Sequence, residues 1–246
     1  MNLIGDLGST ELGFALLLFG TMLLAIVFAI QTAILSRRLR QQEAQRNQME
    51  EIAFCDPLTR LPNRRLLLDR LQRALYTAER ENSNTAIFFV DLDNFKQIND
   101  RFGHATGDAV LEELARRWGA ELRAVDTLAR WGGDEFVIIT GGIMSASDIH
   151  LVAGRLQHAS SAPLSVMGHQ IQLSISIGVS VGCVGTDEPE DLIRCADVAM
   201  YRAKRSGGKP AYEIVGKAAC IERITGLELE PAVPAPAATE YVRVLA

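Results

Sequence analysis

The chain has 246 residues, of which 48% are apolar and 22% are charged, and its formal net charge at pH 7 is −5. This length and apolar content allow a substantial buried core and exclude a chain that is disordered throughout. The negative balance supplies no overall basic field, so we expect no nucleic-acid partner. The four cysteines show no paired spacing, which argues against a zinc site and against a disulfide framework.

The first element in chain order is an apolar stretch over residues 12–35, with no charged residue between Glu11 and Arg37. A bilayer core needs about 20 helical residues. We therefore expect one transmembrane helix over 12–35, preceded by a short exterior segment, 1–11. The alternatives are a cleaved signal peptide or a buried core helix, but the stretch is long and its positive charges follow it, which is the reverse of a signal peptide. Positive charge after the span places the remainder in the cytoplasm.

Residues 36–55 are polar and predict a helical stalk or linker. A globular domain over 56–215 and a flexible Pro/Ala-rich tail over 216–246 follow. The expected elements of the domain are a helix after an Asn63 cap, a buried strand over 86–90, helices over 95–102 and 108–122, a hairpin of strands 127–131 and 136–140, a helix over 147–157, strands over 164–167 and 171–181, and a helix over 189–204. This alternation predicts an α/β (α+β) fold with a central sheet covered by helices.

Acidic residues follow two of the predicted strands. Asp91 ends the strand over 86–90, and Asp134 and Glu135 lie in the turn of the hairpin. If the two strands are neighbours, these carboxylates converge at one sheet edge, and hard oxygen ligands from two chain segments suit a nucleotide-bound Mg²⁺. The alternative from spacing alone is that Asp91 and Asp93 are helix caps and that Asp134 fills a turn.

Several stretches occur in a characteristic order: 56–65 (DPLTRLPNRR), 91–100 (DLDNFKQIND), 102–108 (FGHATGD), 130–136 (RWGGDEF) and 196–204 (ADVAMYRAK). Together they resemble the GGDEF family of diguanylate cyclases over residues 56–212. The resemblance implies a five-stranded sheet wrapped by helices, similar to adenylyl cyclase and polymerase palm domains. It also implies condensation of two GTP into cyclic di-GMP with release of two pyrophosphates, by a homodimer that holds one GTP in each protomer. Taken together with the apolar stretch over 12–35, we expect a single-pass protein of the bacterial cytoplasmic (inner) membrane, with the catalytic domain in the cytoplasm.

The resemblance also assigns roles to residues at matching positions. Two Mg²⁺ per active site, with Mn²⁺ as an alternative ion, would be held by Asp91, the carbonyl of Leu92, Asp134 and Glu135. Asp134 and Glu135 would be catalytic, with Glu135 also able to activate the 3′-hydroxyl, and Gly132 and Gly133 would form the turn. The substrate-binding residues would be Lys96, Asn99, His104, Asp108 and Lys204. Asn99 and Asp108 match the donor and acceptor pattern of guanine, which favours GTP over ATP.

The chain also has a possible second binding site, and it departs from the family pattern at one position. Arg123 and Asp126 resemble the R-x-x-D product-inhibition site, for which the alternative is an ordinary surface ion pair. After Lys204 the family commonly has Gly-Arg-Asn, whereas this chain has Gly208 where the arginine is expected and then Lys209. The leading hypothesis is a membrane-anchored diguanylate cyclase with product inhibition. The alternatives are a non-catalytic cyclic di-GMP receptor that uses the R-x-x-D site, and a cyclase with another nucleotide product.

Overall fold

The computed structural model describes residues 53–182, 188–205, 212–226 and 241–245, together with isolated helical residues between 19 and 38. Most of the predicted membrane helix over 12–35 and of the stalk over 36–55 lies outside the described residues, as does the predicted exterior segment. Within the described part of the chain, no helix is both long enough and apolar enough to cross a membrane. Residues 1–53 and 54–246 are separate compact units, and the sheet belongs to the second.

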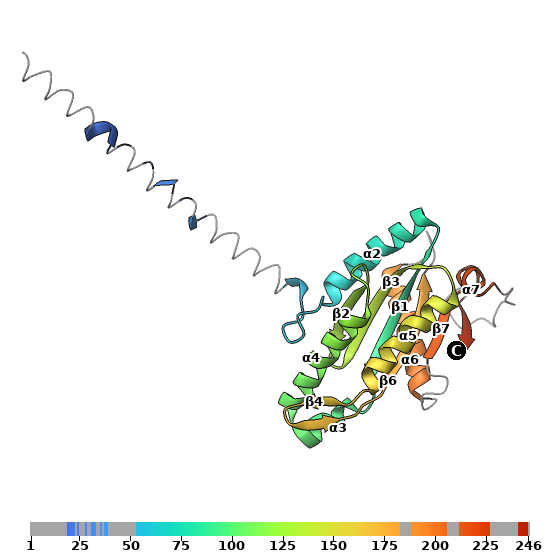
Figure 1. Cartoon of the computed structure of the whole chain (residues 1–246). Helices are drawn as coiled ribbons and strands as arrows, with labels where there is room; N and C mark the ends of the chain where they lie inside the picture. Colours follow the sequence, from blue (N-terminus) through green and yellow to red (C-terminus); the bar gives the residue numbers. More distant parts are fainter. Residues whose placement is uncertain are drawn as a thin grey trace, which may run out of the picture. The chain divides into compact units, whose positions relative to one another are not determined.

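The second unit is built on a six-stranded sheet with the order β2-β3-β1-β6-β7-β8. Its strands are β1 (Asn84–Leu92), β2 (Thr127–Gly132), β3 (Glu135–Ile143), β6 (Ile175–Gly182), β7 (Tyr212–Lys217) and β8 (Tyr241–Leu245). The central strand β1 pairs antiparallel with β3 and with β6, and β6 pairs parallel with β7. A separate hairpin, β4 (Leu164–Val166) and β5 (His169–Ile171), lies near α3 (Phe95–Phe102) in Figure 1.

Helices cover both faces of the sheet because β1 buries side chains alternately on each face. Ile87 and Phe89 pack in one core with buried residues of α2 (Arg64–Glu81) and α6 (Pro189–Arg205). Phe88 and Val90 pack in the other core with α4 (His104–Glu121) and α5 (Ala146–Ser161). On that side Trp118 of α4 is fully buried, and its ring meets the ring of Phe136 edge to face at 5.1 Å.

Local sequence signals explain where two of these helices begin. The side chain of Asn63 accepts hydrogen bonds from the amides of Arg65 (3.0 Å) and Leu66 (3.1 Å), so the predicted cap is confirmed. At the start of α5, Ser145 and Asp148 form a reciprocal capping box. Both caps satisfy amide groups that have no partner inside the helix.

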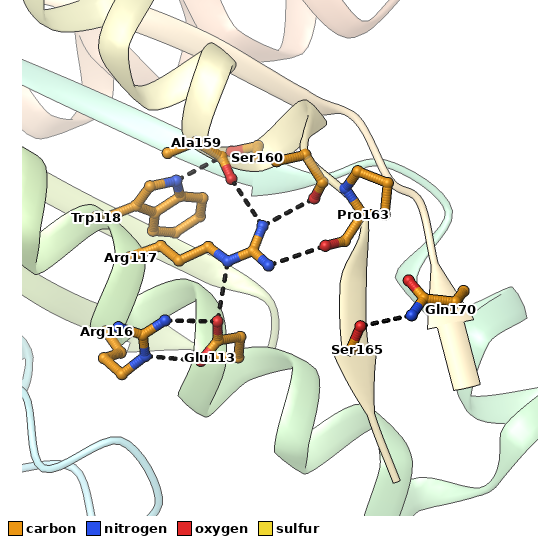
Figure 2. Close-up of polar contacts among 10 residues, drawn as sticks. Glu113, Arg116, Arg117, Trp118, Ala159, Ser160, Pro163, Ser165 and Gln170 are labelled. Atoms are coloured by element: carbon orange, nitrogen blue, oxygen red, sulfur yellow. Dashed lines mark hydrogen bonds and ion pairs between the residues drawn. The ribbon is translucent and has the colours of Figure 1, made fainter. Parts of the chain in front are cut away.

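One arginine of α4 satisfies the other end of α5 (Figure 2). Arg117 donates to the carbonyls of Ala159 (3.3 Å), Ala162 (2.8 Å) and Pro163 (2.9 Å) around the end of that helix. Its Nε donates to Glu113 at 2.9 Å. The carbonyls at a helix end lack intrahelical donors, so this guanidinium fixes α4 against α5.

Two features differ from the sequence-based expectations. Strands β2, β3, β1, β6 and β7 form the expected five-stranded sheet, but β8 adds a sixth strand beside β7. The expectation of a flexible tail over 216–246 is therefore wrong for the described residues, which include α7 (Ala218–Thr225) and β8. The Pro/Ala composition indicated a tail, whereas the short run 241–245 is rich in β-formers and gains backbone partners only through the tertiary fold.

Candidate active site

The acidic residues of two chain segments meet at one edge of the sheet. Asp91 of β1 is the register partner of Glu135 of β3, and Asp134 precedes Glu135 in the turn between β2 and β3. Gly133 in that turn has φ of +55°, a conformation that favours glycine. The predicted pairing of the two strands is therefore confirmed, and it brings Asp91 and Glu135 to the same edge of the sheet. The alternative, in which Asp91 is a helix cap and Asp134 fills a turn, does not account for this pairing.

Lys204 reaches the acidic edge from α6. Its ammonium donates to Oδ1 of Asp91, whose side chain is 13% exposed. α6 can lie this close because Gly178 of β6 has no side chain: a Cβ there would be 2.1 Å from the carbonyl oxygen of Ala196 and 2.1 Å from the amide nitrogen of Met200. Direct contact between helix and strand backbones thus sets the position of Lys204.

The electrostatics of the edge show an excess of negative charge. Burial raises the pKa of Asp91, and the nearby charges of Asp134 and Asp93 add to the effect, while Lys204 opposes it. Burial also raises the pKa of Glu135, followed by the charges of Asp197, Asp91 and Asp134. Burial disfavours the charged form of Lys204, but its hydrogen bond to Asp91 and the surrounding carboxylates outweigh this and raise its pKa. One lysine thus shares the edge with several carboxylates.

The loop after β1 is held by side-chain hydrogen bonds. Asp93 accepts from the hydroxyls of Ser174 and Ser176, each at 2.7 Å, and its amide donates to the carbonyl of Ser174 at 3.0 Å. These bonds fix the chain directly after Leu92, whose carbonyl is one of the expected metal ligands. Ser176 is in β6 and Ser174 lies directly before that strand, and neither serine was predicted to support the site.

The oxygen donors at this edge suit a divalent cation of the Mg²⁺ type, which prefers a few carboxylates completed by phosphate oxygens and water. Within the described ranges, no three His, Cys, Asp or Glu side chains are already gathered in a metal-binding arrangement. Lys204 occupies an oxygen of Asp91 in this arrangement. The donor chemistry fits the cation, and the complete ligand set would require the phosphates of a bound nucleotide.

A second cluster lies between α3 and α4. Asn99 of α3 packs against Gly107 of α4 so closely that a Cβ on Gly107 would be 1.9 Å from its Oδ1. Asp108 is the next residue and is exposed, and His104 and Lys96 are exposed on the same two helices. The structure therefore brings Asn99 beside the turn of helix that carries Asp108, as the guanine-site expectation requires.

The turn at residues 132–134 is tied to the start of the domain by an arginine that sequence reasoning did not assign. Arg130 donates to Oδ1 of Asp56 at 3.0 Å, and its Nε and Nη2 donate to the carbonyl of Gly133 at 3.0 and 2.8 Å. Burial disfavours charged Asp56, but hydrogen bonds from Thr59 and Arg130 prevail and lower its pKa. The signal in the sequence was an arginine two residues before the glycine pair.

Trp131 is the other side chain that supports this turn. The guanidinium of Arg64 lies 4.4 Å from the centre of its ring, and the ring of Phe89 meets it edge to face at 6.1 Å. Its exposure is intermediate, in contrast to the fully buried Trp118. Trp131 therefore packs between α2 and the sheet directly before the Gly-Gly pair.

The expected R-x-x-D site lies in the connection between α4 and β2, at the opposite end of β2 from the acidic turn. The amide of Arg123 donates to Oδ2 of Asp126 at 2.9 Å, while the side chain of Arg123 is exposed. The other carboxylate oxygen of Asp126 is buried without a hydrogen-bond partner. The structure thus separates this site from Asp91 and Asp134.

The strand order and the Gly-Gly-Asp-Glu turn at an acidic sheet edge define an α/β domain of the GGDEF type. The chain belongs to the diguanylate cyclase GGDEF-domain family, whose model matches residues 53–210. The expected family is therefore confirmed, and α7 and β8 lie beyond the matched range.

Three similar proteins illustrate the match. The bifunctional diguanylate cyclase/cyclic di-GMP phosphodiesterase MucR of Pseudomonas aeruginosa is 36% identical over 201 residues, which cover 78% of this chain and 29% of MucR. The diguanylate cyclase TpbB of Pseudomonas aeruginosa is 41% identical over 154 residues, which cover 62% of this chain and 35% of TpbB. The chain thus spans about a third of these relatives.

The third similar protein is a solved structure. The coiled coil and GGDEF domain of DgcB from Caulobacter crescentus, in complex with c-di-GMP, superposes with a TM-score of 0.66 at 27% identity. The match covers 73% of this chain and 95% of the DgcB chain.

Proposed function

We propose that this protein is a diguanylate cyclase that condenses two GTP into cyclic di-GMP and releases two pyrophosphates. The observation that carries the proposal is the pairing of Asp91 with Glu135 at a sheet edge that Lys204 also reaches. Family membership and the relatives named diguanylate cyclase support the reaction.

The residues at the edge divide the work of phosphodiester formation. The proposed ligands of Mg²⁺, or of Mn²⁺, are the oxygens of Asp91, Leu92, Asp134 and Glu135. When bound, the ions would neutralise phosphate charge and align the α-phosphate. Lys204, released from Asp91, contacts the phosphates, and Lys96 adds a second positive charge. Glu135, which lies beside Asp91 at this edge, is also the proposed acceptor of the 3′-hydroxyl proton.

Selection of the base rests on the cluster between α3 and α4. Asp108 is an acceptor for the N1 and N2 protons of guanine, and the Asn99 amide offers both a donor and an acceptor. Adenine presents the opposite pattern on that edge and would leave these groups unpaired. His104, at the start of α4, lies on the same two-helix cluster.

The proposal extends to regulation and cellular location. Each protomer holds one GTP, so the active form is a homodimer. Arg123 and Asp126 bind the product cyclic di-GMP and inhibit turnover, supported by the exposed arginine and the unpartnered oxygen of Asp126. The charge-free stretch over 12–35 anchors the protein in the bacterial inner membrane with the GGDEF domain in the cytoplasm, supported by the arginines that follow the stretch.

The test is an assay of the purified full chain, in detergent, with GTP and MgCl₂. We expect cyclic di-GMP and pyrophosphate by chromatography and mass spectrometry, and no product when ATP replaces GTP. Glu135→Gln should abolish product, whereas Glu190→Gln, a matched change at an exposed glutamate of α6, should leave it unchanged. Absence of product from a folded, dimeric wild-type protein refutes the proposal.

A non-catalytic cyclic di-GMP receptor is the second candidate. Gly208 stands where the family commonly has a phosphate-binding arginine, and this favours weak or absent turnover. The receptor is supported if the wild-type chain makes no product while binding cyclic di-GMP, if Asp134→Ala keeps that binding, and if Arg123→Ala loses it.

A further inference from the structure

Helix α6 is held by ion pairs on both of its flanks. It packs over β6 at Gly178, and the sheet neighbours of β6 are β1 and β7. Toward β1, Lys204 bonds Asp91. Toward β7, Arg202 donates to Oε1 of Glu213 at 3.2 Å. The two basic residues are two positions apart and therefore point to opposite sides of the helix.

Glu213 is an unusual residue for the interior of a sheet. Its side chain is 1% exposed, and its register partner in β6 is Gly178. Its neighbours Tyr212 and Ile214 belong to the core on the α4 and α5 side, so Glu213 points to the opposite face, which α6 covers. A buried carboxylate is costly unless it is paired. Arg202, whose side chain is 53% exposed, supplies a positive charge at the rim of this buried position.

This inference rests on the proposed function, under which nucleotide binding breaks one of the two ion pairs and leaves the other in place. Lys204 cannot remain on Asp91 when Asp91 binds a cation and the lysine contacts phosphate. The polar link between α6 and β1 is then lost. The link from Arg202 to Glu213 lies on β7, two strands from β1, and uses none of the proposed metal or phosphate ligands, so it remains. It is then a polar contact between the last turn of α6 and the sheet that nucleotide binding leaves in place.

We propose that Glu213 is a positioning residue that acts through Arg202: it holds the last turn of α6 against β7 so that Lys204 is delivered to the nucleotide phosphates. The demand on Lys204 is high in this chain because Gly208 replaces the arginine that the family commonly places just beyond it. Glu213 lies just beyond residues 53–210, the range that the family model matches.

The test measures nucleotide affinity and turnover of the full chain. Glu213→Gln should weaken binding of Mg²⁺ with a non-reacting GTP analogue about tenfold, the worth of a charge-assisted hydrogen bond. KM for GTP should rise by a similar factor while kcat changes less. The matched control is Asp191→Asn, which removes an exposed ion pair of the same helix, Asp191 to Arg194 at 2.7 Å, and should leave both constants unchanged.

A double-mutant cycle separates positioning from general stability. In a Lys204→Met background, Glu213→Gln should change nucleotide affinity by less than about twofold, because the residue it positions is gone. Equal effects of Glu213→Gln in both backgrounds would overturn the proposal, as would unchanged affinity in the single variant.

A second pair of variants tests the proposal if Glu213→Gln does not fold. Arg202→Lys keeps the charge and should stay within about threefold of wild-type affinity, whereas Arg202→Gln should show the full loss. If these two variants behave alike, the proposal is wrong. A wild-type chain that binds the analogue but makes no cyclic di-GMP refutes the cyclase alone, because the affinities still decide the role of Glu213. A wild-type chain that does not bind the analogue overturns both.

Discussion

The carboxylates in two clusters of charged residues have pKa values shifted in opposite directions. At the junction of α4 and α5 (Figure 2), Arg117 has acceptors at Glu113 and at three carbonyls. Hydrogen bonds from Arg116 and then Arg117 lower the pKa of Glu113 to about 2. At the acidic edge, burial and neighbouring carboxylates raise the pKa values of Asp91 and Glu135. In the first cluster each charged group is bonded by partners within the protein, and the cluster serves stability, whereas the second leaves negative charge for a ligand to neutralise.

The largest expected effect follows from removing charge at the acidic edge. Asp91→Asn should lower cyclic di-GMP formation by at least about 100-fold, because a metal ligand is lost. Its thermal midpoint without ligand should equal or exceed that of the wild type, since burial already disfavours the charged carboxylate. Assays of turnover and thermal unfolding check both. A large loss of stability without ligand would show that Asp91, like Glu113, stabilises the folded protein.

The converse change removes the guanidinium at the helix junction. Arg117→Ala should cost about 2–4 kcal/mol in the free energy of unfolding, because it leaves the carbonyls at the end of α5 without their donor and removes one of the two arginines that bond Glu113. Turnover per folded molecule should be unchanged. Arg116→Ala is the matched control, since its side chain is 69% exposed, and should cost much less than Arg117→Ala. Denaturant titration measures both, and equal costs would remove the distinction between the two arginines.

Asp56→Asn tests a contact that joins stability and catalysis. Arg130 links Asp56 to the carbonyl of Gly133, so weakening this link should loosen the turn that carries Asp134. We expect turnover to fall about tenfold with a stability loss of about 1–2 kcal/mol. Steady-state kinetics at saturating GTP, alongside thermal unfolding, give the two numbers. Unchanged turnover would mean that the turn keeps its geometry without this arginine.

The smallest effect is a difference in pH dependence. The pKa of Glu113 is lowered from an ordinary value of 4.5 to about 2. Its contribution to stability is therefore fully present above about pH 4.5 and is lost as the pH falls toward 2. Raised pKa values, as at Asp91, have the opposite sign and favour folding as acid is added. Denaturant titrations down to about pH 2.5 should show a shallower loss for Glu113→Gln than for the wild type. Identical slopes would contradict this.

The sequence was most informative where chemistry depends on local pattern. Three local patterns each predicted a structure that was confirmed: the apolar run before Asp91 predicted a strand, the Gly-Gly pair before Asp134 predicted a turn, and Asn63 predicted a helix cap. The order of the motifs along the chain also predicted the family, which is confirmed.

Contacts between distant segments were not predictable in the same way. The bond from Lys204 to Asp91 joins residues 113 positions apart, and Arg117 caps a helix more than 40 positions away. β8 could not be inferred because edge pairing depends on which strand is left open by the rest of the sheet. The membrane helix over 12–35 remains a prediction.

The packing of Trp131 gives the protein an intrinsic optical probe. The chain has two tryptophans, and only Trp131 is beside the Gly-Gly turn, with the guanidinium of Arg64 over its ring. Trp118 is sealed in the core, where its ring packs against Phe136. Fluorescence of a Trp118→Phe protein would therefore come from one indole, and its intensity could follow ligand arrival at the turn in real time without an attached dye.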